Sequence, residues 1–432
     1  MIKILKSKLN NFLIILIFIK QIKTICFFRG IIIMVIKMDI RKRKYADLLL
    51  KCVRAEDKRY LFIDIPNFLS DFKDILLDVA KDYNLDEVYV YETDPFVKHD
   101  LMKKLDQENI NKHPMFNKSI FNKYAKLDAA FIFIESMVPD LMSDIDPEKI
   151  KNTGIHIRST QKYFRDLYEG DKLNWLIAGV PNEYWAKDAL DVSLDDFWEL
   201  LYSVCLVDYD NNPYKDWCNR LDDIGKRTDK LNEYNFKYLR YRTDKGTDLT
   251  VYLPEGHIWH SGKEESGCIV NLPTEEIFTS PQYDKIDGIV YSTKPLVYNN
   301  VLIDEFYFKL EHGKVVEYGA YAGKDVLEGI LTTDDFAGYF GECALVQVDS
   351  PINNTGTLFY NTLYDENASC HFALGRGFNN CNKNEADDIR SIGINDSKVH
   401  VDFMIGDETL SVVGVTYDDK EIDIIKNGNF VI

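Results

Sequence analysis

Short apolar runs alternate with longer helical stretches between Tyr45 and about Val207, and this alternation constrains the fold more than any other feature of the sequence. Between the first two runs, Phe68–Tyr83 carries its apolar residues at helical spacing. Strands separated by helices indicate βαβ units and a mostly parallel sheet. We therefore predict an α/β domain over residues 39–230, with strands at Tyr60–Ile65, Glu87–Tyr91, Ala129–Ile134 and Trp175–Val180.

This N-terminal half lacks the usual nucleotide-binding motifs. Neither the glycine fingerprint of dinucleotide-binding domains nor a P-loop follows any of the four predicted strands. We therefore expect this half to serve as a scaffold and binding region rather than as the region that performs the chemistry.

The pattern changes after two helical stretches, Leu194–Leu206 and Asn211–Arg227, which lead into the charged segment Lys226–Asn235. Because 432 residues are too many for one ordinary core, we place a domain boundary there. Beyond it, strand signals are closely spaced and one helix is predicted at about Asp325–Tyr339. We therefore predict a sheet-rich α+β domain over residues 231–432, with strands at Phe236–Arg242, Thr247–Leu253, Gly288–Ser292, Phe306–Glu311 and Lys314–Tyr318.

Composition limits the classes of partner and compartment. The formal net charge of -18 leaves no basic surplus to meet phosphates, so a nucleic-acid partner is not expected. Eight cysteines are scattered without a Cys-x-x-Cys pair, which argues against a disulfide framework and against a four-cysteine zinc site. We therefore expect free thiols in a reducing compartment, and predict that the protein is cytoplasmic.

The first 38 residues are basic and very apolar, and the fold prediction excludes them. Their apolar runs at Phe12–Ile19 and Ile31–Ile36 are too short to span a bilayer, which needs about 20 apolar residues. Lysines before a short apolar core resemble a signal peptide, but no small-residue cleavage site follows. Three interpretations stay open: a signal peptide, a membrane anchor, or upstream sequence before a true start at Met34 or Met38. A membrane is an expected partner only if this segment belongs to the protein.

Carboxylates and imidazoles gather between Glu342 and Asp402, among residues otherwise suited to a packed interior. His400 and Asp402 lie two apart in an alternating apolar segment, so a strand would point both to the same side. Oxygen and nitrogen donors of this kind suit Zn²⁺, Mn²⁺ or Co²⁺, and two close metals are a common hydrolytic device. The residues of interest are Glu342, Asp365, Glu366, His371, His400 and Asp402, together with Glu275 and Glu276 upstream of this stretch.

Each of these residues, taken singly, is better explained as a solvated or structural side chain, so the metal site depends on their combination. His257 and His260 also resemble a metal-binding pair, but their three-residue spacing in a glycine-flanked loop is weak evidence. We interpret that pair as better suited to line a substrate pocket than to bind metal.

Six long blocks stand out in the second half of the chain: GTDLTVYLP (246–254), PTEEIFTSP (273–281), TKPLVYNNVLI (293–303), GECALV (341–346), SPINNTGTLFYNTLYDENASCHFALG (350–375) and INDSKVHVDFMIG (394–406). Together they resemble the M29 family of metallopeptidases, the aminopeptidase T and aminopeptidase S group. The resemblance implies a homodimeric exopeptidase that removes N-terminal amino acids from peptides through a water activated by two metals. It also implies an α/β first domain, although residues 39–230 carry no comparable signature.

The resemblance further implies two divalent metal ions (Zn, Co or Mn). Four carboxylates among the implied ligands would balance the charge of two such ions, so the cluster can be buried without uncompensated charge. Glu275 is adjacent to Glu276, the first of the implied ligands, and is a candidate catalytic base or a second-layer residue that contacts the ligands. The implied ligands are Glu276, Glu342, Glu366, His371, His400 and Asp402.

One position departs from the family pattern. The family commonly has a Tyr, thought to aid catalysis, a few residues after the position of His371, whereas this chain has Phe378. Phe cannot donate a hydrogen bond to an oxyanion, so Tyr360 or Tyr364 would have to supply the phenol, and Tyr360 is the candidate catalytic residue. The main prediction is a metallo-aminopeptidase. The alternative is a catalytically weak relative that keeps the metal site and binds peptides.

Overall fold

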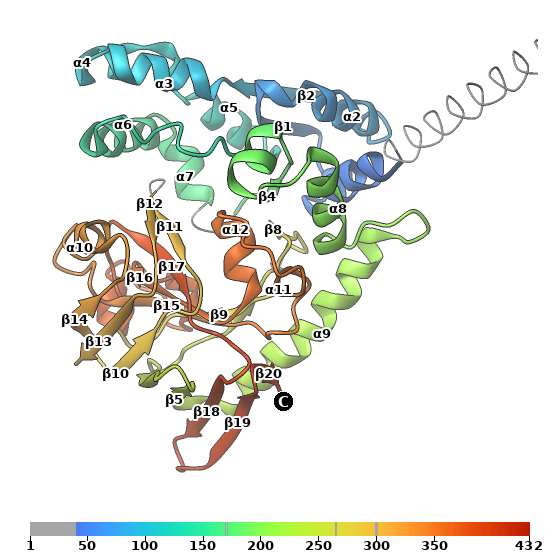
Figure 1. The fold of residues 1–432 in the computed structure, drawn as a ribbon. Coiled ribbons are helices and arrows are strands. Elements are labelled where there is room, and N and C mark those ends of the chain that lie inside the picture. The colour runs from blue at the N-terminus through green and yellow to red at the C-terminus, as the bar shows by residue number, and fades with distance from the viewer. Residues whose placement is uncertain (1–39, 169, 171, 264–265, 299–300) are drawn as a thin grey trace, which may run out of the picture.

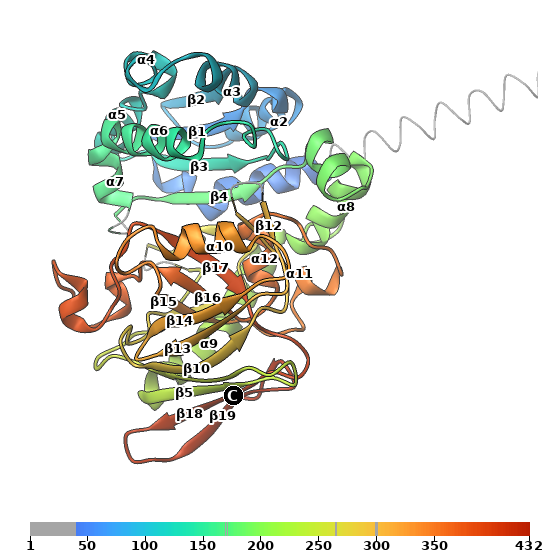
Figure 2. The ribbon, with the colours of Figure 1, turned by 60° about the vertical axis from the view of Figure 1, so that its left-hand side comes forward.

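The computed structural model describes residues 40–432 except 169, 171, 264–265 and 299–300. A sheet with helices on both faces forms the N-terminal part and lies over a sheet-rich C-terminal part (Figures 1 and 2). This architecture confirms the predicted combination of an α/β region with a sheet-rich α+β region. The predictions made for the first 38 residues lie outside the described residues.

The N-terminal sheet has the strand order β2-β1-β3-β4-β8, and all of its described strand pairs are parallel. Its strands are β1 (Tyr60–Pro66), β2 (Glu87–Thr93), β3 (Ala130–Glu135), β4 (Trp175–Gly179) and β8 (Asn271–Leu272). The first four agree with the predicted strands, because near-continuous apolar runs are typical of a parallel sheet covered on both faces.

Two different apolar cores flank this sheet. The helices that cover it are α2 (Ser70–Ala80), α3 (Pro95–Lys104), α4 (Gln107–Lys112), α5 (Ile120–Lys126), α6 (Pro147–Thr160), α7 (Lys162–Tyr168) and α8 (Leu194–Val204). Leu61 of β1 belongs to the core shared with α2, α8 and the helix over residues 40–52. Phe62 points the other way, and its ring lies 4.5 Å from that of Phe121 on α5. Successive strand residues therefore serve opposite cores.

Helix α9 (Pro213–Tyr234) connects the N-terminal part to the C-terminal sheets (Figure 1). We predicted that this helix ends at Arg227, and the prediction was wrong because one side of it stays buried through the charged segment. The helix stops at Asn235, which adopts a left-handed backbone (φ 47°), a common way to end a helix. The buried residues recur every three or four positions: Trp217, Leu221, Ile224, Thr228 and Leu231.

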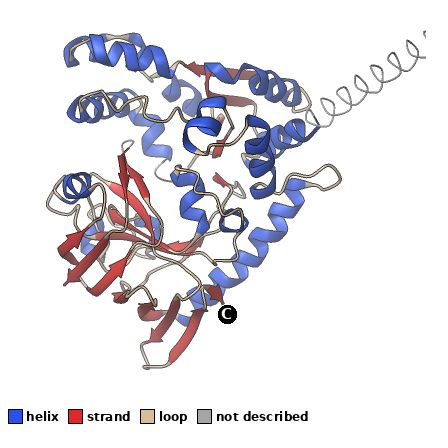
Figure 3. Cartoon of the chain, viewed as in Figure 1, coloured by secondary structure: helices blue, strands red, loops and turns tan. Residues whose placement is uncertain are grey.

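The C-terminal part is built from antiparallel sheets, drawn as the red arrows of the lower half of Figure 3. The larger sheet, in the order β14-β13-β10-β6-β5-β18-β19-β20, contains β5 (Phe236–Arg242), β6 (Asp248–Tyr252), β10 (Ile286–Tyr291), β13 (Tyr307–Glu311), β14 (Lys314–Gly319), β18 (Ser411–Thr416), β19 (Glu421–Lys426) and β20 (Asn429–Phe430). The smaller sheet, in the order β17-β16-β15-β9-β7, contains β7 (His260–Ser261), β9 (Ile277–Thr279), β15 (Phe340–Leu345), β16 (His371–Gly375) and β17 (His400–Met404). A separate hairpin pairs β11 (Leu296–Tyr298) with β12 (Val301–Ile303).

Helix α10 (Lys324–Leu331) is shorter than the predicted helix over Asp325–Tyr339, which was wrong at its C-terminal end. The hydroxyls of Thr332 and Thr333 donate back to helix carbonyls at 2.8 and 3.0 Å, and the Asp334 carboxylate accepts a nearby backbone N–H at 2.9 Å. Such local hydrogen bonds compete with helical ones, so the helix ends there. Two short helices, α11 (Pro351–Asn354) and α12 (Thr362–Asp365), precede β16.

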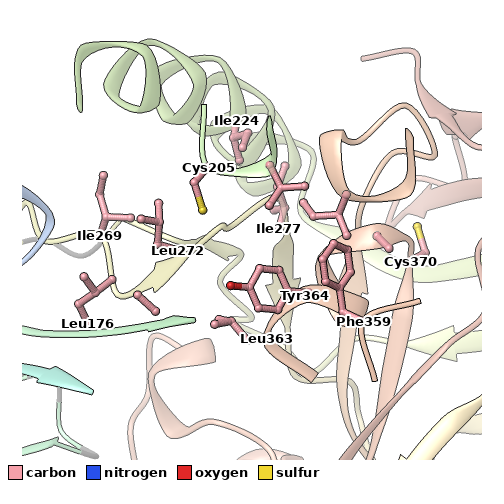
Figure 4. Packing of buried hydrophobic residues seen from close by; sticks show 14 of the residues in the cluster. Leu176, Cys205, Ile224, Ile269, Leu272, Ile277, Phe359, Leu363, Tyr364 and Cys370 are labelled. Carbon is pink, nitrogen blue, oxygen red and sulfur yellow. The ribbon is translucent and has the colours of Figure 1, made fainter. Parts of the chain in front are cut away.

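One continuous apolar core joins the two parts of the molecule. Strand β8 comes from beyond residue 231 but pairs with β4, so one short strand crosses the predicted boundary. The division at residue 230 stays a prediction. Figure 4 shows side chains from β4, β8, β9, α9, the end of α8 and the segments around α12 packed together: Leu176, Cys205, Ile224, Ile269, Leu272, Ile277, Phe359, Leu363, Tyr364 and Cys370.

Six of the seven cysteines in the described residues are buried, and all seven are free thiols. Burial raises the pKa of Cys343 well above its usual range and that of Cys370 to about 12. These thiols therefore stay protonated near neutral pH and behave as small apolar residues. Across the part of the chain that the structure describes, no helix combines the length and apolar content needed to cross a bilayer.

Candidate metal centre

Neighbouring strands of the smaller sheet bring most of the predicted ligands to one face. Glu342 and Asp402 both pair with Ala373, one from each side, across β15, β16 and β17. Paired residues of antiparallel strands point to the same side, so the two carboxylates project together over the small Ala373 side chain. His371 and His400 lie two residues before Ala373 and Asp402, and therefore share that face.

The ligand atoms form two groups that share one carboxylate. Atoms of Glu276, Glu342 and His371 lie within 4.8 Å of one another. Atoms of Glu342, His400 and Asp402 do the same. Nε2 of His371 is 3.2 Å from Oε2 of Glu276, and Nε2 of His400 is 3.2 Å from Oε2 of Glu342. Glu342 therefore stands between two groups of three possible ligand atoms.

Backbone carbonyls orient both imidazoles. Nδ1 of His371 lies 3.2 Å from the carbonyl oxygen of Ser369, and Nδ1 of His400 lies 2.7 Å from that of Arg376. A proton on Nδ1 that donates to a carbonyl leaves Nε2 as the free lone-pair nitrogen in the neutral ring. In both histidines that nitrogen faces the carboxylates, the arrangement that metal-binding histidines require.

The pKa values of these groups show that they act on one another. Burial alone would lower the pKa of His371, but Glu276 raises it to about 9. Burial likewise opposes the charge on His400, yet Asp402 and Glu342 raise the pKa of this imidazole well above its usual range. Burial raises the pKa of the Glu342 carboxyl. Among the groups that the structure describes, the two histidines are the main positive partners of these carboxylates.

Glu366 belongs to the same electrostatic environment without joining either group of close ligand atoms. It begins the short helical turn Glu366–Ala368, just before β16. Burial, followed by the charges of Glu276 and Asp402, raises the pKa of the Glu366 carboxyl well above its usual range. Its carboxylate therefore lies close enough to the other ligands to be destabilised by them.

Glu275 points to a different partner from its neighbour Glu276. Both of its carboxylate oxygens accept hydrogen bonds from the Arg220 guanidinium of α9. Its side chain is only 2% exposed, and its backbone N–H donates to Oδ1 of Asn367 at 2.6 Å. Glu275 is therefore not among the residues that the structure gathers into the two groups, although its contacts hold Glu276 in place.

Tyr360 lines a small pocket together with Asp402, at the edge of the ligand groups. Its backbone is left-handed (φ 57°), a conformation that costs a residue other than glycine about 1–3 kcal/mol. The Asp365 carboxylate stabilises this turn by accepting the N–H groups of Phe359 and Asn361 at 2.7 and 3.0 Å. Asp365 thus supports the pocket wall rather than joining the ligand groups.

Phe378 lies at the open rim of the site. Its ring centroid is 5.1 Å from that of His400 and 5.6 Å from that of Phe278. The Phe378 side chain is 37% exposed, and that of His400 keeps 30% of its surface accessible. Solvent and ligands therefore reach the site beside an aromatic ring that has no hydrogen-bond donor.

His257 and His260 lie outside the ligand groups. Nδ1 of His257 contacts the carbonyl of Pro254 at 3.1 Å, and Nε2 of His260 contacts that of Asn380 at 2.8 Å. Sequence reasoning did not foresee the roles of Arg220 or Asn361. Neither residue carries a local signal, because each acts on a partner far away in the sequence.

The donor set fits divalent metal ions. It consists of carboxylate oxygens and imidazole nitrogens, which suit Zn²⁺, Mn²⁺ and Co²⁺. Oδ1 of Asp402 is buried, and the described partner nearest to it is Nε2 of His400 at 3.3 Å. Several carboxylates buried together are unfavourable unless a cation compensates them. The site therefore defines a metal-binding protein, with the donor set of a metal-dependent enzyme.

Comparison with known proteins gives the family. Residues 38–430 match the family described as thermophilic metalloprotease (M29). The chain is 34% identical over 401 residues to Aminopeptidase 2 of Geobacillus stearothermophilus, covering 90% of this chain and 97% of that protein. It is 29% identical over 404 residues to Aminopeptidase T of Thermus aquaticus, covering 90% and 98%. The solved structure of wild-type AmpT from Thermus thermophilus matches with a TM-score of 0.83 at 28% identity, covering 92% of this chain and 100% of that one.

The chain belongs to the M29 family of metallopeptidases and is an enzyme of the hydrolase class. The predicted family, fold class and enzyme class are thereby confirmed.

Proposed function

We propose that this protein is a metal-dependent aminopeptidase that removes N-terminal amino acids from peptides with the help of two divalent metal ions. The observation that carries the proposal is the position of Glu342 in both groups of ligand atoms. Two ligand groups that share a carboxylate suit a two-metal site. The names of the relatives from Geobacillus and Thermus, both aminopeptidases, support cleavage from the N-terminus.

The residues of both groups, together with Glu366, would hold the ions. Four carboxylates with a charge of −1 each would offset two ions of +2 each, so the charges sum to zero. Zn, Co and Mn are the candidate metals, because all accept mixed oxygen and nitrogen donors. The proposed ligands are Glu276, Glu342, Glu366, His371, His400 and Asp402.

Bound divalent ions supply Lewis acidity, which polarises a peptide carbonyl and makes water more acidic. The chain itself provides orientation and a partly dry environment. Tyr360, which lines the pocket beside Asp402, is the candidate donor to the oxyanion that forms when the carbonyl is attacked. Glu275 acts indirectly, since its contacts with Arg220 and Asn367 position the backbone of the adjacent ligand.

A metal titration tests this function. The protein from Met38 onward is stripped of metal and then titrated with Zn²⁺, Co²⁺ or Mn²⁺ while hydrolysis of leucyl, arginyl and glutamyl anilides is followed. Activity is expected to return as about two metal equivalents bind, as a two-metal site requires. Absence of stoichiometric metal binding would overturn the proposal.

The second candidate function is peptide binding with little turnover, and the observation that favours it is Phe378 at the open rim. Replacement of Phe378 by Tyr separates the two. A folded protein with two metals but no turnover, in which Phe378→Tyr restores hydrolysis, would be the catalytically weak relative. Full turnover in the unmodified chain would leave the aminopeptidase.

We also infer a cytoplasmic homodimer, from the free buried thiols and from the family resemblance. Light scattering on the purified chain tests the dimer, for which a mass of twice 50.2 kDa is expected.

A further inference from the structure

A partly buried carboxylate outside the metal centre has no counter-charge among the described residues. Glu135 is the last residue of β3, at the carboxyl edge of the parallel sheet, where ligands of such sheets commonly bind. Its Oε2 accepts a hydrogen bond from Nδ2 of Asn361 at 2.9 Å, a contact that joins the two parts of the molecule. No described residue donates to its Oε1.

Two other acids of the same sheet have cationic partners. Asp64 on β1 lies 3.0 Å from Nζ of Lys118, and Glu92 on β2 lies 2.7 Å from Nζ of Lys73. For Glu135, burial raises the pKa and Asn361 alone opposes the rise, without a contribution from any described cation. A partly buried carboxylate whose described partner is one neutral amide keeps an oxygen available for a cationic ligand.

This carboxylate is one side chain away from the metal centre. Asn361, which donates to Glu135, lines the same pocket as the proposed ligand Asp402. The lining also includes Tyr360 and Thr362, and α12 lies directly below β4 of the parallel sheet (Figure 2). A substrate that extends from this pocket past Asn361 would therefore reach the carboxylate of the N-terminal part.

We propose that Glu135 binds the primary ammonium group of the first residue of the substrate, so that the N-terminal part contributes directly to recognition. This inference rests on the proposed aminopeptidase function. Every substrate of such an enzyme carries an α-ammonium, and a lysyl substrate carries a second ammonium on its side chain. A carboxylate with one free oxygen pairs with either group through a charge-assisted hydrogen bond.

The test compares Glu135→Gln with the unmodified metal-loaded enzyme on lysyl and norleucyl anilides, which differ by the side-chain charge. Gln still accepts the hydrogen bond of Asn361, so a purely structural role leaves KM unchanged. We expect KM to rise about 10-fold while kcat changes by less than about twofold, because the variant loses one charge-assisted contact with the substrate. The matched control is Asp64→Asn on the same sheet edge, whose charge is already met by Lys118 and whose KM values should not move.

The two substrates distinguish the two sources of the ammonium. An equal rise in KM for both identifies the α-ammonium, and a rise confined to the lysyl substrate identifies the side chain. Unchanged KM for both, in a folded Glu135→Gln protein, overturns the inference. If Glu135→Gln does not fold, Glu135→Asp replaces it, with a smaller rise in KM expected.

Failure of the proposed function would appear separately, as absence of turnover in the unmodified enzyme. Calorimetric binding of Lys-Ala and norleucyl-Ala dipeptides then measures the same contact without hydrolysis. In that case a weaker affinity of the Glu135→Gln protein supports the inference, and equal affinities overturn it.

Discussion

The carboxylates that face the metal centre and those directly behind it are compensated in different ways. Behind the centre, Glu275 is paired with Arg220, and Asp365 accepts backbone N–H groups. Within it, Glu342 and Glu366 are surrounded mainly by other carboxylates and two histidines. The first region is complete as it stands, whereas the second requires added positive charge.

Two histidines differ in the same way, one outside the metal centre and one within it. Burial lowers the pKa of His257 to about 4, because no carboxylate faces it strongly enough to oppose desolvation. His371 is buried as well, but Glu276 raises its pKa to about 9. Burial thus favours the neutral form of His257, whereas Glu276 favours the charged form of His371. Of the two, only His371 lies among carboxylates that need a cation.

The largest expected effect comes from Glu342→Gln, which removes the carboxylate shared by the two groups. We expect kcat/KM for leucyl anilide to fall about 10³-fold, or about 4 kcal/mol, together with loss of bound metal. Elemental analysis and kinetics measure both. The control is Glu311→Gln on β13, an exposed acid whose loss should change neither quantity. Full metal content and activity in Glu342→Gln would contradict the claim that the carboxylates within the metal centre, unlike those behind it, are there to bind metal.

The next effect is the acid sensitivity due to His257. Above pH 6.5, the ordinary pKa of histidine, the His257 imidazole is neutral in both the folded and the unfolded chain. His257 therefore causes no pH dependence of the free energy of unfolding in that range. As the pH falls from 6.5 to about 4, the unfolded chain takes up a proton that the folded chain refuses, and stability is lost. The loss reaches about 3 kcal/mol.

Urea denaturation of His257→Asn between pH 7 and pH 4 measures this loss. Asn keeps a donor for the Pro254 carbonyl but does not titrate, so its stability should fall less steeply with acid. His312→Asn is the matched control, because His312 is exposed in a left-handed turn that Asn tolerates. Parallel pH profiles for the unmodified chain and His257→Asn would contradict the expectation.

A smaller effect is expected for Glu275→Gln, which leaves Arg220 without its charged partner. We expect a loss of about 2 kcal/mol in the free energy of unfolding that is already present in metal-free protein. The exposed pair of Glu421 with Arg240 supplies the control, since Glu421→Gln should cost little. A loss that appeared only with metal bound would instead place Glu275 in the metal centre.

Glu275 also shows where sequence reasoning stops. The apolar runs predicted the parallel strands because burial on both faces leaves a local signature. His400 and Asp402 were placed on one side of a strand by their spacing alone. Nothing local, however, distinguishes Glu275 from Glu276, since their separation depends on Arg220, 55 residues away. The ligand set as a whole came from the family resemblance, not from spacing.

Long-range contacts limited the fold prediction in the same way. Strand β8 joins the N-terminal sheet although it follows the predicted boundary, and no local property of Asn271–Leu272 predicts its pairing with β4. The contact of Asn361 with Glu135 spans 226 residues. Helix α10, by contrast, ended early for a local reason, because the polar run after Leu331 bonds back to the helix.

The last prediction concerns the second acidic pair, Asp365 and Glu366. In metal-free protein, replacing each carboxylate by its amide should change the stability in opposite directions. In metal-free protein Glu366→Gln removes a carboxylate that burial and its neighbours destabilise, so we expect a gain of about 1 kcal/mol in stability. With metal present the sign should reverse, because the variant has lost a ligand and gains less from binding. Thermal unfolding in EDTA and in Mn²⁺ measures both. Asp365→Asn is the control, expected to destabilise in either condition because its carboxylate holds the Tyr360 turn. A loss of stability in metal-free Glu366→Gln would show that this carboxylate is already compensated by the protein, as Glu275 is.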